Sequence, residues 1–257
     1  MIDYQDVHKA FDVPVLSGVN LSVRTGEKLS IVGPSGTGKS VLLKTTLGLI
    51  RPDRGDVLID GESVVQASRA TLARIRRKVG YVFQYAALFD SLTVYENVCL
   101  GLPDEELHSL GSREVLRRVC EALADVNLEA AQVLGKLPAE LSGGMRKRVG
   151  LARAIVGRPA FILYDEPVTG LDPVNAATVD QLIVEIATKK AGVTSIIVTH
   201  DIVGALEISD RVALLDHGKL RFVGSPEDFV SSQDPLVHAF ADRLAAAAAA
   251  LKIMEEK

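Results

Sequence analysis

A glycine-rich segment near the start of the chain has the residue types and the spacing that bind phosphate. Residues 33–40 match the pattern G-x-x-x-x-G-K-[ST] in full, after an apolar run at 29–32 and before a helical pattern at 41–50. Glycine lets successive backbone N–H groups turn toward phosphate oxygens, and the following helix points the positive end of its dipole at the same anion. A chance match would arise in about one of 100 chains of this length. The segment predicts a nucleoside triphosphate site formed by Gly33, Pro34, Ser35, Gly36, Thr37, Gly38, Lys39, Ser40 and Val41.

Two acidic residues follow the apolar run at 161–164. A parallel strand that ends in Asp165 and Glu166 would deliver both carboxylates to the edge of the sheet where phosphates bind. We expect Lys39 to reach the β- and γ-phosphates, and the Ser40 hydroxyl and Asp165 to hold Mg²⁺. Glu166 is placed to polarise the attacking water as general base. An exposed acidic turn is the alternative interpretation.

Two more polar residues end apolar runs. His200 follows the run at 196–199, and we expect it to contact the γ-phosphate and to orient Glu166 or the water. A histidine at a strand end is more often structural, but the shared sheet edge favours a catalytic role here. Gln84 follows Val82-Phe83, and its amide is a further candidate for magnesium or for the attacking water.

The segment Leu141–Met145 precedes a helical pattern at 146–157. Ser142 is a good N-cap, and Gly143 and Gly144 leave backbone N–H groups exposed to an incoming anion. A capped helix start is the simpler interpretation. A chain that already has a phosphate loop needs no second cradle for the same nucleotide, however. One solution is a head-to-tail dimer, in which each cradle closes on the nucleotide of the partner. This signature segment comprises Ser142, Gly143, Gly144 and Met145.

Apolar runs and turn residues predict the elements that position these motifs. Strands are expected at residues 15–23, 28–32, 57–59, 80–83, 160–164, 195–198, 211–215 and 219–223, with turns at 25–27, 60–61 and 216–218. The runs at 160–164 and 195–198 are continuous, as in parallel strands covered on both faces, and a crossover helix is expected at 175–189. Residues 88–157 have a mostly helical pattern.

These motifs, in this order, resemble the ATP-binding cassette (ABC) ATPases. The resemblance rests on the phosphate loop, Gln84, the signature segment with residues 146–154, Asp165-Glu166, Gly170-Leu171-Asp172 and His200, and it covers residues 2 to about 240. It implies ATP and Mg²⁺ as cofactors and a homodimer of ATPase subunits. It further implies that Phe11 stacks on adenine and that Asp172 couples the two sites across the dimer.

The family implies an α/β fold: a RecA-like P-loop NTPase core with an N-terminal antiparallel β subdomain and an inserted α-helical subdomain. The ATPase domain would span residues 2–240, with the nucleotide-binding core at 1–87 and 158–235 and the helical subdomain at 88–157. Residues 241–257 contain six consecutive alanines and predict a C-terminal helical tail.

Composition excludes several classes of protein. Lys plus Arg total 29 against 33 for Asp plus Glu, a formal net charge of −4, which argues against a nucleic-acid partner. Cys99 and Cys120 have no Cys or His at the spacing typical of metal ligands, and both are expected to be reduced thiols. Neither a signal peptide nor a run of about 18 apolar residues is present, so we expect a cytoplasmic protein. The mean hydropathy of +0.21 is slightly high, which indicates extra core or a surface reserved for a partner.

Residues around the signature segment suggest which class of substrate the transporter carries. Met145 stands where many cassette ATPases have Gln, and residues 87–94, 138–141, 224–227 and 234–240 are similar to the MlaF-type ATPases of phospholipid transport systems. In those systems the ATPase pairs with an integral membrane permease, a STAS-domain protein and an MCE-domain protein. The resemblance implies a position on the cytoplasmic face of the inner membrane, reached through the permease. Tyr85 and Ala86 depart from the expected small residue followed by Gly.

Other functions fit the sequence less well. A cassette ATPase of DNA repair or translation would need a coiled-coil insertion or a second cassette, and 257 residues hold neither. A phosphoryl-transfer enzyme would leave the signature segment unexplained. The ATPase of an importer for a small polar solute, such as an amino acid, remains the alternative. If a permease is the partner, part of residues 88–101, beside Gln84, should be an exposed docking surface.

Overall fold

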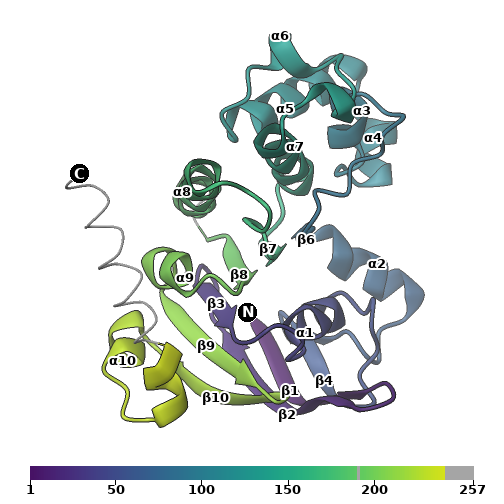
Figure 1. Cartoon of the computed structure of the whole chain (residues 1–257). Helices are drawn as coiled ribbons and strands as arrows, with labels where there is room; N and C mark the ends of the chain where they lie inside the picture. Colours follow the sequence, from purple (N-terminus) through teal and green to yellow (C-terminus); the bar gives the residue numbers. More distant parts are fainter. Residues whose placement is uncertain (190–191, 241–257) are drawn as a thin grey trace, which may run out of the picture.

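The computed structural model describes residues 1–189 and 192–240, and its strands form two sheets (Figure 1). The smaller sheet is antiparallel and has the order β2-β1-β4-β5. The larger sheet has the order β10-β9-β3-β8-β7-β6, and it is parallel except for β10. The strands are β1 (Ile2–Ala10), β2 (Pro14–Val23), β3 (Lys28–Val32), β4 (Arg54–Ile59), β5 (Glu62–Ser63), β6 (Val79–Val82), β7 (Phe161–Asp165), β8 (Thr194–Val198), β9 (Arg211–Asp216) and β10 (Lys219–Gly224).

Helices cover the larger sheet and form a separate group between β6 and β7 in the chain. Figure 1 shows this group, α3 to α7, gathered at one end of the molecule. The helices are α1 (Lys39–Thr46), α2 (Arg69–Arg77), α3 (Val94–Cys99), α4 (Asp104–Ser109), α5 (Ser112–Ala124), α6 (Ala130–Val133), α7 (Gly143–Ile155), α8 (Pro173–Lys189), α9 (Ile202–Ile208) and α10 (Pro226–Val230), with a 3-10 turn at Pro138–Glu140. The predicted α/β fold, with its antiparallel sheet and its RecA-like mixed sheet, is confirmed.

The strand β1 was not predicted, because its pattern is broken. Ile2, Tyr4 and Val7 are buried, but the register shifts between Tyr4 and Val7. Asp6 lies in that interval with φ +48, so a bulge interrupts the alternation of buried and exposed residues. The predicted turn at 25–27 does not join a hairpin. It joins β2, which pairs with β1, to β3, which belongs to the other sheet.

Two predicted hairpin turns are present. The β4–β5 loop is Asp60-Gly61, with φ values of +52 and +79, and the β9–β10 loop is His217-Gly218, with φ values of +45 and +72. Both loops have positive φ at their two central residues, which matches the twist of the flanking strands. The second hairpin adds β10 as the antiparallel edge strand of the larger sheet.

The larger sheet is buried on both faces, which explains its continuous apolar runs. Leu163 and Ile196 face the core that β1, β2 and α1 complete. Tyr164 and Ile197 face the opposite core, which includes residues of α3, α5, α7 and α8. Side chains alternate between the two faces along each strand, so both sets must be apolar. The helical group is therefore anchored on the same strands that carry the predicted catalytic residues.

In the described ranges, no helix has both the length and the apolar character needed to cross a membrane. The predicted Ala-rich tail, residues 241–257, lies outside the described residues.

Candidate functional site

The predicted catalytic residues meet at one edge of the larger sheet. Neighbouring strands β3, β8, β7 and β6 run parallel, so their carboxyl ends lie together. The phosphate loop follows β3, Asp165 ends β7, His200 comes two residues after β8, and Gln84 comes two residues after β6. Ligands of open α/β sheets bind outside this edge. The tertiary structure thus brings together residues that are up to 167 positions apart in the sequence, from Gly33 to His200.

The backbone of the phosphate loop depends on glycine at two close approaches. Gly33 has φ +149, and a Cβ atom there would lie 2.1 Å from the carbonyl oxygen of Leu215. Gly38 has φ +101 and would place a Cβ 2.8 Å from the carbonyl oxygen of Val15. Gly38 is also the N-cap of α1, and its residue type supplies no side chain to cap the helix. The N-terminus of α1 therefore keeps backbone N–H groups for an anion.

Lys39 is buried inside the phosphate loop. Its Nζ donates to the carbonyl oxygens of Gly33 at 2.8 Å and of Pro34 at 2.9 Å, and the residue is 5% exposed. Burial lowers the pKa of Lys39, while the carboxylates of Glu166 and Asp165 act in the opposite direction. Phosphate oxygens are stronger hydrogen-bond acceptors than carbonyl oxygens. The ammonium group of Lys39 is therefore positioned to leave these carbonyl oxygens and donate to the phosphates of a nucleotide instead.

Asp165 is held by two hydroxyl groups. Ser40 Oγ donates to Asp165 Oδ1 at 2.6 Å, and the Tyr81 hydroxyl donates to Asp165 Oδ2 at 2.8 Å. Burial and the neighbouring Asp165 charge raise the pKa of Tyr81 far above its ordinary value, so this hydroxyl remains a donor. The pair of Ser40 and Asp165 offers adjacent hard oxygen ligands, which suit Mg²⁺. Among the described residues, no group of three or more His, Cys, Asp or Glu side chains could hold a metal by itself, so the remaining ligands would come from Gln84, phosphate or water.

Glu166 and His200 form a close pair. His200 Nδ1 lies 2.6 Å from Glu166 Oε2, and Thr169 Oγ1 donates to the same oxygen at 3.0 Å. The carboxylate favours a proton on Nδ1, so Nε2 of a neutral His200 would be an acceptor. Glu166 has φ +51, and its N–H donates to the carbonyl oxygen of Val198 at 2.8 Å. This backbone bond fixes an unfavourable conformation and aims the carboxylate at His200.

An acidic cluster lies behind His200. Asp201 caps α9 by accepting from Gly204 N at 3.2 Å. A Cβ atom at Gly204 would lie 2.9 Å from Asp201 Oδ2 and 3.0 Å from Asp180 Oδ2, so both carboxyl groups pack against this glycine. Burial, followed by the charges of Asp201 and Glu207, raises the pKa of Asp180 to about 7. The start of α9, which follows His200 in the chain, therefore packs against a carboxyl group whose pKa is raised toward neutral pH.

The signature segment starts α7 as predicted. Ser142 Oγ accepts from Met145 N at 3.2 Å, and Ser142 and Gly143 are exposed. Gly144 is buried against Asn175, and a Cβ atom at Gly144 would lie 2.5 Å from Asn175 Oδ1. In the described part of the chain, this segment forms no hydrogen bond with the phosphate loop.

Asp172 lies next to the signature segment through Asn175. Its Oδ2 accepts from Asn175 Nδ2 at 2.6 Å and its Oδ1 accepts from Asn175 N at 3.1 Å, which lowers the pKa of Asp172. Asp172 itself is exposed at the start of α8. The signature segment and Asp172 thus face solvent on adjacent helix starts.

Phe11 lies in the loop between β1 and β2. Its ring is 60% exposed, and Lys9 Nζ is 5.3 Å from the ring centroid. Pro14 and Val15, which follow this loop, line a cavity of about 290 Å³ together with residues 34–37 and 216–218. An exposed aromatic ring in the loop that leads to the cavity-lining Pro14 is suited to stacking on a base.

Several residues of the site were not found by sequence reasoning. Tyr81 and Thr169 hold Asp165 and Glu166, and Asn175 holds Asp172. Tyr81 carries a local signal, because it lies on the short strand that leads to Gln84. The other two have common polar side chains with no distinctive spacing.

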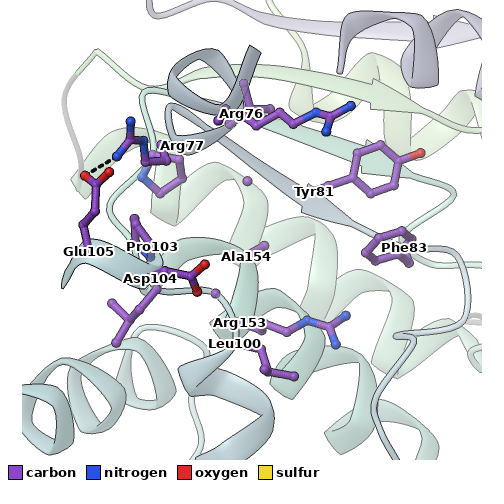
Figure 2. A pocket seen from close by; sticks show the side chains of 17 residues that line it. Arg76, Arg77, Tyr81, Phe83, Leu100, Pro103, Asp104, Glu105, Arg153 and Ala154 are labelled. Carbon is purple, nitrogen blue, oxygen red and sulfur yellow. Dashed lines mark hydrogen bonds and ion pairs between the residues drawn. The ribbon is translucent and has the colours of Figure 1, made fainter. Parts of the chain in front are cut away.

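A groove of about 550 Å³ runs between α2 and β6 on one side and residues 100–105 and α7 on the other. Figure 2 shows Arg76, Tyr81, Phe83, Leu100 and Arg153 around it, with the ion pair between Arg77 and Glu105 at its rim. Phe83 packs on Tyr81 with ring centroids 4.6 Å apart. Tyr81 therefore contacts both the groove and Asp165.

The fold and this edge define a P-loop ATPase: a phosphate loop between strand and helix, a hydroxyl and an aspartate side by side, and a glutamate paired with a histidine. A family model described as "ABC transporter" matches residues 16–169. The chain belongs to the ABC transporter family and is an ABC-type ATPase.

Individual relatives agree with this assignment. The chain is 40% identical to the "Probable ribonucleotide transport ATP-binding protein mkl" of Mycobacterium leprae (strain TN), over 86% of this chain and 62% of the relative. It is 38% identical to "Protein TRIGALACTOSYLDIACYLGLYCEROL 3, chloroplastic" of Arabidopsis thaliana, over 94% of this chain and 73% of the relative. The chain thus spans about 60% of the length of the mycobacterial relatives it matches.

A solved structure shares the fold. The dimeric, post-hydrolysis state of the ATP-binding cassette MJ0796 bound to ADP and Pi superposes with a TM-score of 0.79 at 32% identity, covering 88% of this chain and 99% of that one.

Proposed function

We propose that this chain is the ATP-hydrolysing subunit of an ABC transporter that energises phospholipid transport through a separate membrane permease. The observation that supports ATP hydrolysis is the pair of Glu166 and His200, whose Oε2 and Nδ1 atoms are 2.6 Å apart, together with the buried Lys39. Glu166 would accept a proton from the attacking water, with its orientation fixed by His200 and Thr169. Lys39 and the N-terminus of α1 would bind the phosphates.

Mg²⁺ fits the site through oxygen ligands. Ser40 and Asp165 would hold the ion, with Gln84 as the third candidate from the neighbouring strand end. The ion would neutralise charge that develops on the phosphate oxygens. The Tyr81 hydroxyl keeps Asp165 oriented toward Ser40, since it occupies the second carboxylate oxygen. Phe11 would stack on the adenine beside the cavity at residues 34–37.

A homodimer would complete each site. Ser142 and Gly143 are exposed, and in the described residues the signature segment forms no hydrogen bond with the phosphate loop of its own chain. A head-to-tail dimer would place Ser142, Gly143, Gly144 and Met145 of one chain on the nucleotide of the other. Asp172 would then lie at the interface and couple the two sites. The dimeric state of the MJ0796 cassette supports this arrangement.

The groove beside Gln84 is the proposed permease surface. Phe89 is 57% and Leu100 50% exposed, whereas Val94 and Val98 are fully buried. Part of residues 88–101 is therefore available for a partner, and part belongs to the core. Apolar and charged side chains both line the groove, and the charged ones include Arg76, Arg153 and Asp104. The proposed occupant is a short helix with an apolar face and an acidic residue that would lie beside Arg76 or Arg153. The chain would lie on the cytoplasmic face of the inner membrane through this contact.

Phospholipid is the proposed substrate, with STAS-domain and MCE-domain proteins as further partners. The support is the similarity around Met145 and residues 87–94, together with the Arabidopsis relative, which carries the name of a galactolipid and aligns over 94% of this chain. Import of a small polar solute remains the alternative, and it is supported by the mycobacterial relative named for ribonucleotide transport.

Purification of the complex would test this function. The chain, carrying an affinity tag and expressed in its own cells, would be extracted with mild detergent. Its partners would be identified by mass spectrometry and its bound lipids by solvent extraction. We expect a permease, an MCE-domain protein and stoichiometric phospholipid. A permease that co-purifies without lipid, together with a periplasmic solute-binding protein, would support the importer instead.

A further inference from the structure

The turn Gln84–Ala87 holds two consecutive alanines in an unfavourable conformation. Ala86 has φ +55 and Ala87 has φ +48. In this left-handed region a Cβ atom comes close to the following carbonyl oxygen, and glycine is the residue that avoids the strain. The position of Ala86 is the one where the sequence departs from an expected glycine. Contacts from outside the turn must therefore stabilise it.

Arg153 of α7 makes two of those contacts. Its guanidinium donates to the carbonyl oxygen of Ala86 at 2.6 Å and to that of Ala87 at 2.7 Å. The same group lies 5.7 Å from the ring centroid of Phe83. The planar fork of arginine matches two neighbouring acceptors, and such bonds to a charged donor are stronger than neutral ones. Arg153 thus holds both left-handed residues at once.

Lys147 of α7 makes the third contact and joins the turn to the catalytic edge. Its Nζ donates to the carbonyl oxygen of Gln84 and, at 3.4 Å, to that of Glu166. Lys147 is only 8% exposed. Gly150 lets α7 approach this closely, because a Cβ there would lie 3.2 Å from the Ala86 carbonyl oxygen. One ammonium group therefore connects the backbones of the two residues assigned to the attacking water.

We propose that Lys147 and Arg153 are positioning residues, a clamp through which α7 sets the places of Gln84 and Glu166. The proposal rests on the roles proposed above for those two residues. The N-terminus of α7 is the signature segment, and Arg153 also lines the groove beside Phe83. A displacement of α7 by a partner at either place is carried to both catalytic segments by the same side chains.

Substitution of the clamp tests this role. We expect Lys147→Met and Arg153→Met each to lower kcat of the purified full chain about tenfold, with the KM for MgATP unchanged within about twofold. Lys147→Arg keeps the charge and is expected to retain more activity than Lys147→Met. Arg148→Met is the matched control, because Arg148 lies on the same helix but donates to the carbonyl oxygen of Asn127 at 3.0 Å, inside the helical group. The proposal is overturned if Arg148→Met lowers kcat as much as the clamp variants do. It is also overturned if the clamp variants keep the kcat of the parent.

Rescue by glycine separates positioning from general stability. If Arg153 acts by holding left-handed residues, Ala86→Gly with Ala87→Gly makes the turn less dependent on it. The triple variant with Arg153→Met should then recover kcat to within about threefold of the parent. No recovery in a triple variant that melts like the parent overturns the role of Arg153.

A fluorescent reporter follows the turn directly. The chain has no tryptophan, and Tyr85 is 80% exposed, so Tyr85→Trp places a single fluorophore in the turn. In the Glu166→Gln background we expect MgATP to change the tryptophan emission, and Lys147→Met to abolish that change while nucleotide binding persists. An unaltered change overturns the clamp. The unsubstituted chain, assayed in parallel, tests ATP hydrolysis itself, so failure of the proposed function is recognised separately.

Discussion

Two helices of this chain, α1 and α7, have glycine at the N-cap or in the first turn and are predicted to bind an anion at their N-termini, but their surroundings differ. The N-cap of α1 is Gly38, in a left-handed conformation, with no side chain capping the helix. The two residues that follow, Lys39 and Ser40, contact the phosphate loop and Asp165. The N-cap of α7 is Ser142, whose hydroxyl already satisfies Met145 N. Ser142 and Gly143 lie at the surface.

These surroundings determine which half of a nucleotide site each helix could supply. The α1 end has a buried cation, a hydroxyl and two carboxylates within one network, so it can bind and activate a nucleotide. The α7 end offers backbone N–H groups and a hydroxyl, and the acid next to it, Asp172, is held by Asn175. It can therefore recognise an anion presented by another molecule but cannot hydrolyse it. The predictions below test this division.

Lys39→Met should have the largest effect. Loss of a charge-assisted hydrogen bond is expected to weaken ATP binding about 10- to 100-fold, and turnover should fall below detection. The fold should persist, because the substitution removes a buried charge whose pKa is already lowered by burial. Binding of a fluorescent ATP analogue and phosphate release would be measured. Lys44→Met, in the last turn of the same helix, is the control and should behave like the parent. Normal binding by Lys39→Met would refute the assignment of the α1 end.

Glu166→Gln should separate binding from chemistry at the α1 end. Without the general base, kcat is expected to fall about 100-fold or more, while ATP still binds. The ATP-bound form should then accumulate as a dimer, visible by size-exclusion chromatography with MgATP and not with MgADP. Hydrolysis at the parent rate would exclude Glu166 as the base.

Gly143→Asp should break the α7 end alone. A Cβ at Gly143 has no atom nearer than 4.0 Å, so the substitution fits the monomer. The new carboxylate would favour the helix N-terminus but repel the phosphates of a partner's nucleotide. We expect ATP-dependent dimerisation in the Glu166→Gln background to be lost, with ATP binding to the monomer retained. Gly143→Ala adds bulk without charge and should weaken dimerisation less. Equal dimerisation of the Asp variant and the parent would contradict the trans arrangement.

Asp180→Asn should have the smallest effect, because Asp180 lies outside both helix ends, beside Gly204 at the start of α9. The pKa of Asp180 is raised from 3.8 to about 7, so its contribution to stability is present at acidic pH and is lost as pH rises toward 7. Asparagine cannot ionise. We expect a gain of about 1–2 kcal/mol in the free energy of unfolding at pH 8 and little change near pH 4.

Denaturant unfolding at both pH values would measure this difference. The exposed Asp90→Asn serves as control, and it should show no pH-dependent gain. A gain for Asp180→Asn that is equal at pH 4 and pH 8 would show that the carboxyl group is not protonated near neutrality.

Much of the site could be predicted because its motifs are local. The phosphate loop needs glycine at particular dihedral angles, and the apolar runs before Asp165 and His200 reveal buried parallel strands. Ser142 could be predicted as an N-cap from its neighbours alone. The strand β1 could not, because the bulge at Asp6 breaks the period-2 pattern on which such predictions depend.

Local sequence patterns were sufficient to predict the class of chemistry, the order of the motifs and the elements that carry them. The contacts between distant residues required the folded chain: Ser40 and Tyr81 share Asp165 across 125 and 84 residues of sequence, and Lys147 joins the backbones of Gln84 and Glu166. Helix periods and turn signals come from interactions between residues a few positions apart. Contacts between distant segments follow from the order of strands in the sheet and the packing of helices on it, which no local pattern encodes.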